Sequence, residues 1–124
     1  MAQQLAQLSD AEKADMETPD WHYIVGWSHG KEKFEGKPDY SKGSFYANPV
    51  YEQYEGHYDE NGQPRQYHNI WPTQHLPQFQ DALCDLGSFI NGIGCEVAGR
   101  LDTYIESRHP SYNDGTLQTA LSQS

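Results

Sequence analysis

A long apolar stripe in the second half of the chain constrains the fold more than any other feature. After Pro77, large apolar side chains recur at steps of three and four residues, which is the period of an α-helix. Pro110 ends the pattern because proline cannot continue a helix. The spacing predicts a helix of roughly 28 residues within 77–107, about 42 Å long. Its stripe consists of Phe79, Leu83, Leu86, Ile90, Ile93, Val97, Leu101 and Ile105.

The composition suggests that this helix needs a partner. Four glycines lie inside the predicted helix, and each lowers its stability by roughly 1 kcal/mol relative to alanine, so close packing must compensate. They are Gly87, Gly92, Gly94 and Gly99. Only 35% of the 124 residues are hydrophobic, many of them aromatic, and mean hydropathy is −0.90. We therefore expect residues 1–124 to form a single partial domain without a self-sufficient core.

The rest of the chain divides into segments that differ in residue pattern and in predicted secondary structure. Residues 2–16 are predicted to be helical, with Ser9 and Glu12 spaced as a capping box for a helix that starts at about Asp10. Residues 21–75 alternate aromatic and turn-forming residues, which predicts short strands and loops, the first over the segment WHYIVGW. The tail 108–124 predicts a turn followed by a short helix from about Thr116. These segments predict an α+β fold.

Charge and cysteine content point to a soluble, cytoplasmic protein. Eighteen acidic and eight basic residues give a net charge of −10, which repels nucleic acids and anionic membranes. We find neither a secretory leader pattern nor an apolar run of about 18 residues. Cys84 and Cys95 would lie roughly 16 Å apart on the long helix, too far for a disulfide. Free thiols fit a reducing compartment.

Three ordered segments carry a resemblance to a known family. They are LSDAEKADM, GWSHGKEKFEGKPDYSKGSFYANPVY and YHNIWPTQHLPQFQDA, followed by the long helix. Together they resemble the N-terminal, non-catalytic region of the isopenicillin N synthase-like, Fe(II)- and 2-oxoglutarate-dependent oxygenases. In that family a jelly roll, or double-stranded β-helix, follows this region. Its strands hold Fe(II) through a His-x-Asp pair and a distal His, and an Arg about ten residues beyond the distal His binds 2-oxoglutarate.

The resemblance implies an N-terminal fragment of a non-haem iron dioxygenase, an oxidoreductase that acts on a small-molecule substrate. The chain reaches Ser124 about where the jelly roll would begin, and it starts after the first strand of the family. We expect the long helix to buttress the jelly roll and the chain by itself not to be catalytic. Fe(II) and 2-oxoglutarate would bind in the full-length protein. The alternative is a standalone, non-enzymatic binding or scaffolding module.

One combination of residues within this chain imitates the iron motif. His57 and Asp59 form a His-x-Asp pair, and His109 lies downstream as a possible third ligand. The pair falls in or beside a polar, turn-rich loop, and the residue ten positions past His109 is Thr119 rather than arginine. We therefore expect a loop histidine and a turn-forming aspartate, with no metal, catalytic or cofactor-binding residues in this chain. The other histidines lack the paired spacing of a zinc site.

Two further groups of residues receive predicted roles. Trp27, Ser28 and His29 are candidates for the substrate side of a cavity, because the corresponding strand of isopenicillin N synthase contributes an Arg and a Tyr to substrate binding. This sequence has Ile24 and Ser28 at the aligned positions, so only a general substrate-side role carries over. A second group should fix turns, with Trp71 anchoring the long helix on the strands. This group is Tyr46, Asn48, Pro49, Asn69, Trp71 and Pro72.

Overall fold

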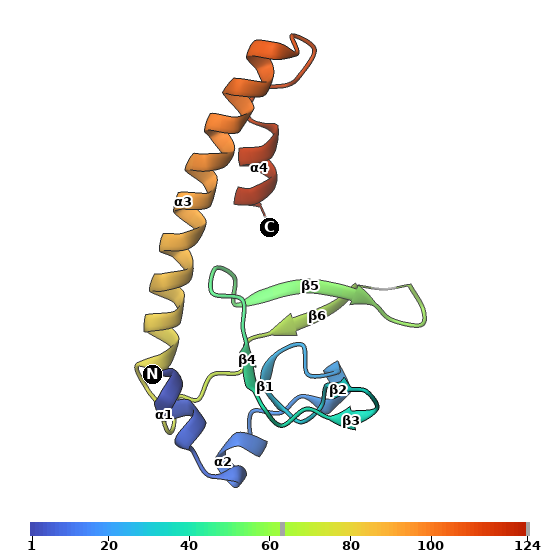
Figure 1. The fold of residues 1–124 in the computed structure, drawn as a ribbon, viewed down its shortest axis with the longest axis vertical. Helices are drawn as coiled ribbons and strands as arrows, with labels where there is room; N and C mark the ends of the chain where they lie inside the picture. The colour runs from blue at the N-terminus through green and yellow to red at the C-terminus, as the bar shows by residue number, and fades with distance from the viewer. Residues whose placement is uncertain (63, 124) are drawn as a thin grey trace. The chain divides into compact units, whose positions relative to one another are not determined.

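The computed structural model describes residues 1–62 and 64–123, without the side chains of residues 53–58 and 64–66. Its mixed helices and strands confirm the predicted α+β class (Figure 1). The chain forms two compact units, Met1–Leu83 and Cys84–Ser124, whose boundary lies within the longest helix. The described helices are α1 (Ala2–Gln7), α2 (Asp10–Ala14), the 3₁₀ helix η1 (Pro19–Trp21), α3 (Phe79–Arg108) and α4 (Thr116–Ser122).

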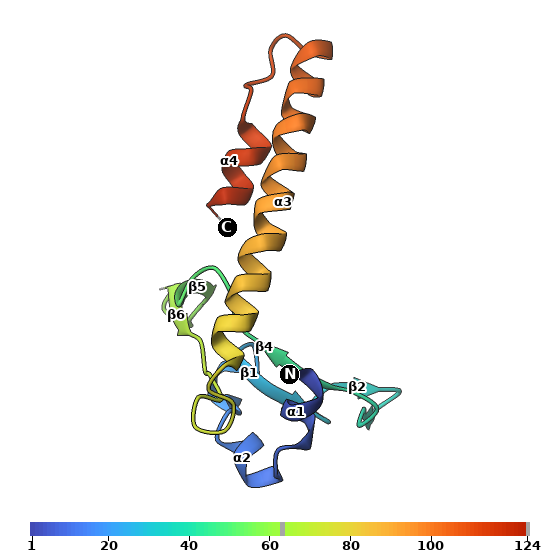
Figure 2. The same cartoon turned by 90° about the vertical axis from the view of Figure 1, so that its left-hand side faces the viewer.

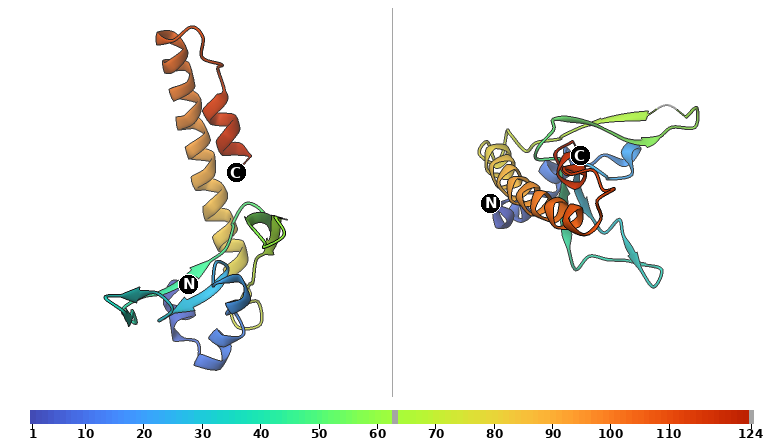
Figure 3. Two further views of the ribbon diagram at one scale, coloured as in Figure 1. Left: turned by 90° about the vertical axis from the view of Figure 1, so that its right-hand side faces the viewer. Right: turned by 90° about the horizontal axis from the view of Figure 1, so that it is seen from above.

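The described strands form two-stranded antiparallel sheets, all within the first unit. They are β1 (Gly26–His29) with β4 (Gly43–Tyr46), β2 (Lys33–Phe34) with β3 (Lys37–Pro38), and β5 (Gln53–Tyr58) with β6 (Pro64–His68). The β2–β3 hairpin, cyan in Figure 3, continues outward from β1 and β4. Its turn residues Glu35 and Gly36 have φ of 50° and 80°, the left-handed pair that a two-residue hairpin requires.

The β1–β4 ladder separates a core face from an outward face. Trp27 pairs with Phe45, and Ser28 pairs with Ser44. Because side chains alternate along a strand and paired residues share a face, Trp27 and Phe45 project together toward the core. Ser28 and Tyr46 project to the opposite face, since Tyr46 pairs with Gly26.

The core of the first unit joins α1, the strands and the start of α3. Its buried members are Leu5, Met16, Trp27 and Phe79. Phe45 meets Phe79 edge to face with ring centroids 5.0 Å apart. Trp71 packs against the same cluster. Aromatic rings thus supply much of the apolar contact that this aliphatic-poor sequence lacks.

The N-terminal capping box is confirmed. Glu12 donates its backbone N–H to Ser9 Oγ at 3.3 Å and accepts the Ser9 backbone N–H at 2.7 Å. The Ser9 hydroxyl also donates to the Glu12 carboxylate at 2.6 Å. This hydrogen bond first, and then the one from the Ser9 backbone N–H, lower the pKa of Glu12 below its ordinary 4.5. The same carboxylate lies 3.0 Å from His75 Nδ1. Glu12 therefore links α2 to the turn that precedes α3.

The predicted strand over WHYIVGW begins later than expected. Residues 19–21 form η1, His22 and Tyr23 follow with φ of 53° and 60°, and β1 starts only at Gly26. The amide of Tyr23 donates to Thr18 O at 3.0 Å, and the Thr18 hydroxyl donates to Val25 O at 2.6 Å. The alternation prediction was wrong here because these local hydrogen bonds satisfy the backbone without a ladder partner.

Gly26 is required by both its conformation and its surroundings. Its φ is +79°, and a Cβ at this position would lie 2.0 Å from Met16 O. That oxygen accepts the Trp27 backbone N–H at 2.9 Å. A side chain at residue 26 would therefore displace the hydrogen bond that brings the end of α2 to β1.

We predict that Gly26→Ala destabilises the first unit by about 3 kcal/mol or more. Gly36→Ala is the matched control, because Gly36 has φ of +80° and an added Cβ there would meet no described atom within 4 Å. It should cost only the left-handed strain, about 1–2 kcal/mol. Urea unfolding followed by tryptophan fluorescence measures both. Equal losses would show that the Met16 contact is unimportant.

In the second unit, α4 lies alongside the C-terminal half of α3 (Figures 1 and 2). Small residues of α3 permit the approach: a Cβ at Gly94 would come within 3.1 Å of Leu121, and one at Gly99 within 3.2 Å of Gln118. The predicted close packing of helix glycines is thus confirmed at these two positions. At Gly92, by contrast, an added Cβ would meet no described atom within 4 Å.

Asp102 of α3 holds the first turn of α4. Its carboxylate is fully buried and accepts the backbone N–H groups of Leu117 and Gln118 at 2.9 and 3.0 Å, together with the Tyr112 hydroxyl. The N-cap of α4 is Gly115, which has no side chain to cap the helix. Burial by itself raises the pKa of Asp102, but these hydrogen bonds bring it below the ordinary 3.8. Asp102 therefore caps α4 from another helix.

We predict that Asp102→Asn releases α4 from α3. The asparagine amide would turn a donor toward one of the two N–H groups, and a seven-residue helix is not stable alone. Amide hydrogen exchange of residues 117–122 should accelerate by at least about tenfold. Asp85→Asn is the control, because it removes the same negative charge from an exposed position of α3. It should leave these exchange rates unchanged.

The same contact should depend on pH. Because the folded-state pKa of Asp102 is lowered, its contribution to stability is complete above the unfolded-state value and is lost as pH falls through the folded-state value. Protection of the α4 amides should therefore begin to decrease below about pH 4 and continue to fall as the pH is lowered further, after correction for intrinsic exchange. Protection that persists unchanged at pH 2 would contradict the capping role.

Candidate functional site

Among the residues that imitate an iron motif, Asp59 has another role in the structure. His57 lies in β5, and its side chain is outside the described residues. Asp59 Oδ1 accepts the Asn61 backbone N–H at 2.8 Å, and Gly62 N–H donates to Asp59 O at 3.0 Å, so Asp59 forms the hairpin turn. His109 follows α3 in the other unit. Among the described side chains, no three His, Cys, Asp or Glu residues are grouped to hold a metal.

A recess on the outward face of β1 and β4 is the candidate functional site. Its volume is about 540 Å³. The lining residues come from the segment that follows η1, from β1, from the loop after β1 and from β4. The lining residues are His22, Tyr23, Ile24, Ser28, Lys31, Glu32 and Tyr46. The left-handed backbone at His22 and Tyr23 places these two residues at the wall, in a conformation that costs bulky side chains free energy and that clusters at functional sites.

The three residues predicted for the substrate side have different positions. Ser28 lines the recess and is only 7% exposed, whereas Trp27 lies in the core. His29 is exposed, with Nε2 3.1 Å from Tyr40 O. Strand alternation separates Ser28 from its two neighbours. Ile24, the other aligned position, does line the recess.

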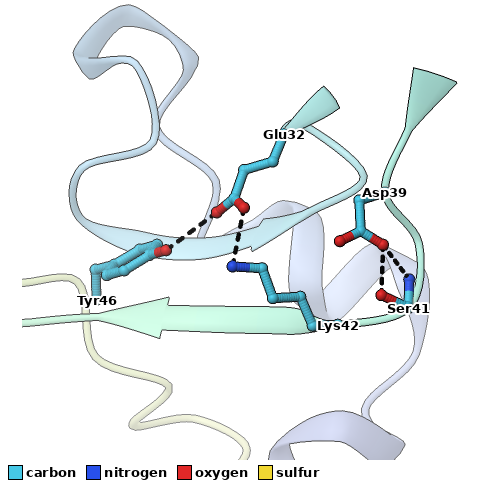
Figure 4. A network of polar contacts seen from close by, with 5 residues as sticks. All are labelled: Glu32, Asp39, Ser41, Lys42 and Tyr46. Atoms are coloured by element: carbon cyan, nitrogen blue, oxygen red, sulfur yellow. Dashed lines mark hydrogen bonds and ion pairs between the residues drawn. The ribbon is translucent and has the colours of Figure 1, made fainter. Parts of the chain in front are cut away.

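The charged groups at the recess are already paired. Lys31 Nζ lies 2.9 Å from Glu17 and 4.8 Å from the centroid of the Tyr23 ring, and the Glu17 hydrogen bond raises the pKa of Lys31. Glu32 lies 2.8 Å from Lys42 Nζ and accepts the Tyr46 hydroxyl at 3.4 Å, as Figure 4 shows. Such exposed pairs contribute little stability, but they leave the recess nearly neutral.

The structure gives Asn69 a central place among the residues predicted to fix turns. Asn69 is 5% exposed; it accepts the Asn48 backbone N–H at 2.8 Å and donates to the carbonyls of Asn48 and Tyr51 at 2.8 and 3.1 Å. Asn48 Oδ1 in turn accepts the backbone N–H groups of Val50 and Tyr51 at 2.9 Å. Trp71 Nε1 donates to Glu52 at 3.1 Å. The loop around Pro49, between β4 and β5, is thus tied to the segment at Pro72.

We predict that Asn69→Ala destabilises the first unit by roughly 3 kcal/mol, because three backbone groups lose a buried partner. Asn69→Asp should not rescue the protein, since a carboxylate cannot donate to the two carbonyls. Asn61→Ala, at an exposed turn position, is the control and should change the unfolding free energy by less than about 0.5 kcal/mol. The measurement is urea unfolding; a loss below about 1 kcal/mol for Asn69→Ala would contradict the assignment.

A second candidate surface is the outward face of α3, which we define by its large, exposed apolar side chains. Their exposed fractions range from 48% to 66%. At roughly 100° per residue they project within an arc of about 120°. Asp102, which accepts hydrogen bonds from the first turn of α4, and the buried Ala98 project roughly 160° and 120° from the centre of this arc. The members are Leu86, Phe89, Ile90, Ile93, Val97, Leu101 and Tyr104. Thus α4 covers the side of α3 that carries small residues, and the large apolar side chains of α3 remain exposed.

No family model, curated protein or solved structure matches this chain. Among the described residues, no helix is long and apolar enough to cross a bilayer. Sequence reasoning named Ser28 for the side of a cavity, and that role stays a prediction. It did not name His22 and Tyr23, which line the same recess, because nothing in their segment indicated a left-handed turn. It did find the stripe of α3, since helical period is visible in sequence.

Proposed function

We propose that this chain is the N-terminal, non-catalytic part of a non-haem Fe(II)-dependent oxygenase that uses 2-oxoglutarate. The exposed outward face of α3 is the observation that carries the proposal. Seven large apolar side chains lie about half exposed on one face of one helix. Monomeric proteins rarely expose an apolar patch larger than a few hundred Å² unless a partner covers it.

A jelly roll is the partner that fits both the face and the sequence blocks. A sheet offers a broad apolar surface on which a long helix buries its stripe. In the oxygenase family that the ordered segments resemble, such a jelly roll follows this region, so the proposal expects one after α4. In this arrangement α3 buttresses the jelly roll, and the recess at Ser28 lies on the substrate side.

The chemistry would belong to the jelly roll and not to this chain. Fe(II) and 2-oxoglutarate, when bound there, activate O₂ for oxidation of a small-molecule substrate. The described side chains of this chain do not fit a three-ligand iron site. What these residues supply is the helix surface that supports the jelly roll and the wall of a substrate-side recess.

The second candidate is a standalone binding or scaffolding module. The same exposed face favours it, because a hydrophobic helix surface is also a common docking site for a separate protein. In that case the face would be covered by a protein encoded elsewhere, and no iron motif would follow in the same reading frame.

Sequencing the transcript through both ends of this reading frame separates the two candidates. We expect it to continue into strands with a His-x-Asp pair and a distal His, and an Arg about ten residues farther on would indicate 2-oxoglutarate. A stop codon directly after Ser124 would reject the oxygenase proposal and favour the standalone module.

At the protein level, we predict that the isolated chain binds the hydrophobic dye ANS at the outward face of α3. The double variant Ile90→Glu/Ile93→Glu should lower ANS fluorescence by at least about half, and it should change the unfolding free energy by less than roughly 1 kcal/mol because both side chains are already exposed. Ser88→Glu, on the opposite side of the same helix, is the control for added negative charge and should retain dye binding.

The same double variant tests what covers the face in a longer protein. If a jelly roll follows in the frame, the substitutions should destabilise the full-length protein by at least about 2 kcal/mol, since they would bury charges without partners. A full-length protein that tolerates them would show that another surface contacts the jelly roll.

A further inference from the structure

We propose that the recess in the first unit binds a small, neutral aromatic molecule that carries a hydroxyl group. This inference goes beyond the proposed function, because it concerns a binding site formed entirely by residues of this chain. It rests on the shape, charge and hydrogen-bonding capacity of the recess.

The size and walls of the recess suit an aromatic ring. Its volume of about 540 Å³ falls within the range of roughly 300–1,000 Å³ that is typical of small-molecule sites. Tyr23 and Tyr46 line the recess from two different segments, the residues after η1 and strand β4, and Ile24 adds an aliphatic side chain. Aromatic side chains favour stacked or edge-to-face contact with another ring.

The pairing of charges at the recess selects against an ionic ligand. Lys31 is engaged by Glu17 and by the Tyr23 ring, and Glu32 is engaged by Lys42 and the Tyr46 hydroxyl. A ligand carboxylate would have to compete with Glu17 for Lys31, and a ligand ammonium would have to compete with Lys42 for Glu32. A neutral ligand displaces neither pair.

Ser28 supplies the polar contact that the ligand would satisfy. It is 7% exposed, and the β1–β4 register directs it to the same face as Tyr46. Among the described residues its hydroxyl makes no hydrogen bond with another side chain or with the backbone. A nearly buried hydroxyl that faces a recess can both donate to and accept from a ligand hydroxyl.

The backbone at the recess wall is a further indication of a site. His22 and Tyr23 are consecutive non-glycine residues with positive φ. Their backbone N–H groups donate to the nearby carbonyls of Pro19 and Thr18. Strained conformations of this kind persist where the surrounding structure demands a particular side-chain position. Here that position is in the lining of the recess, which also includes Ser28 and Tyr46.

The test is a titration of the isotope-labelled 124-residue chain with phenol at pH 7, followed by NMR. We expect saturable shifts at the amides of Tyr23, Ile24, Ser28 and Tyr46, with a dissociation constant of about 1–10 mM, as is usual for a ligand of this size. Benzoate and benzylammonium, which have a similar ring and opposite charges, should bind at least about fivefold more weakly.

Two variants locate the contact within the recess. Ser28→Ala should weaken phenol binding by about fivefold through the lost hydrogen bond. Ser44→Ala is the matched control, since Ser44 pairs with Ser28 in the ladder but does not line the recess. Its phenol affinity should equal that of the unmodified chain. The spectra of both variants also report whether each is folded.

Three results would overturn the inference. They are the absence of shifts at the recess up to about 20 mM phenol, tighter binding of benzoate or benzylammonium than of phenol, and equal affinities for Ser28→Ala and Ser44→Ala. Shifts confined to the outward face of α3 would count as the first of these. Because the readout lies in the first unit, such a failure would not bear on the docking of α3.

Discussion

The hydrogen bond from the Trp27 amide to the Met16 carbonyl, 2.9 Å long, fixes the organisation of the first unit. It can form only because residue 26 is a glycine in a left-handed conformation. It joins the end of α2 to the start of β1 and directs the Trp27 ring into the core. Once Trp27 faces the core, strand alternation places Ser28 on the opposite face. The recess therefore depends on a backbone contact made some distance from it.

The two sides of α3 illustrate how one helix can serve two purposes. Gly94 and Gly99 on one side let α4 approach, and Asp102 holds α4 in place by capping it. The other side keeps its large apolar residues exposed. A single helix thus stabilises its own unit with small residues and leaves its large ones exposed. Under the proposed function a jelly roll would cover them.

Several elements could be predicted from sequence because their signals are local or periodic. The Ser9–Glu12 capping box, the helix between Pro77 and Pro110 and the short helix at Thr116 were predicted and are present. The strand at Trp21 was predicted wrongly. Thr18 provides hydrogen bonds that alternation cannot reveal, and they turn the chain at His22 and Tyr23 into a left-handed conformation.

The sequence by itself determined which residues are apolar, where helices begin and end, and which side chains share a helix or strand face. It could not determine which face would be covered. The tertiary structure decided that α4 packs on the small residues of α3, that Asp102 caps a helix fifteen residues away, and that Ser28 meets Tyr23 at one recess. The physical reason is that these contacts join residues with no regular spacing, and each depends on backbone angles that only the packed chain imposes.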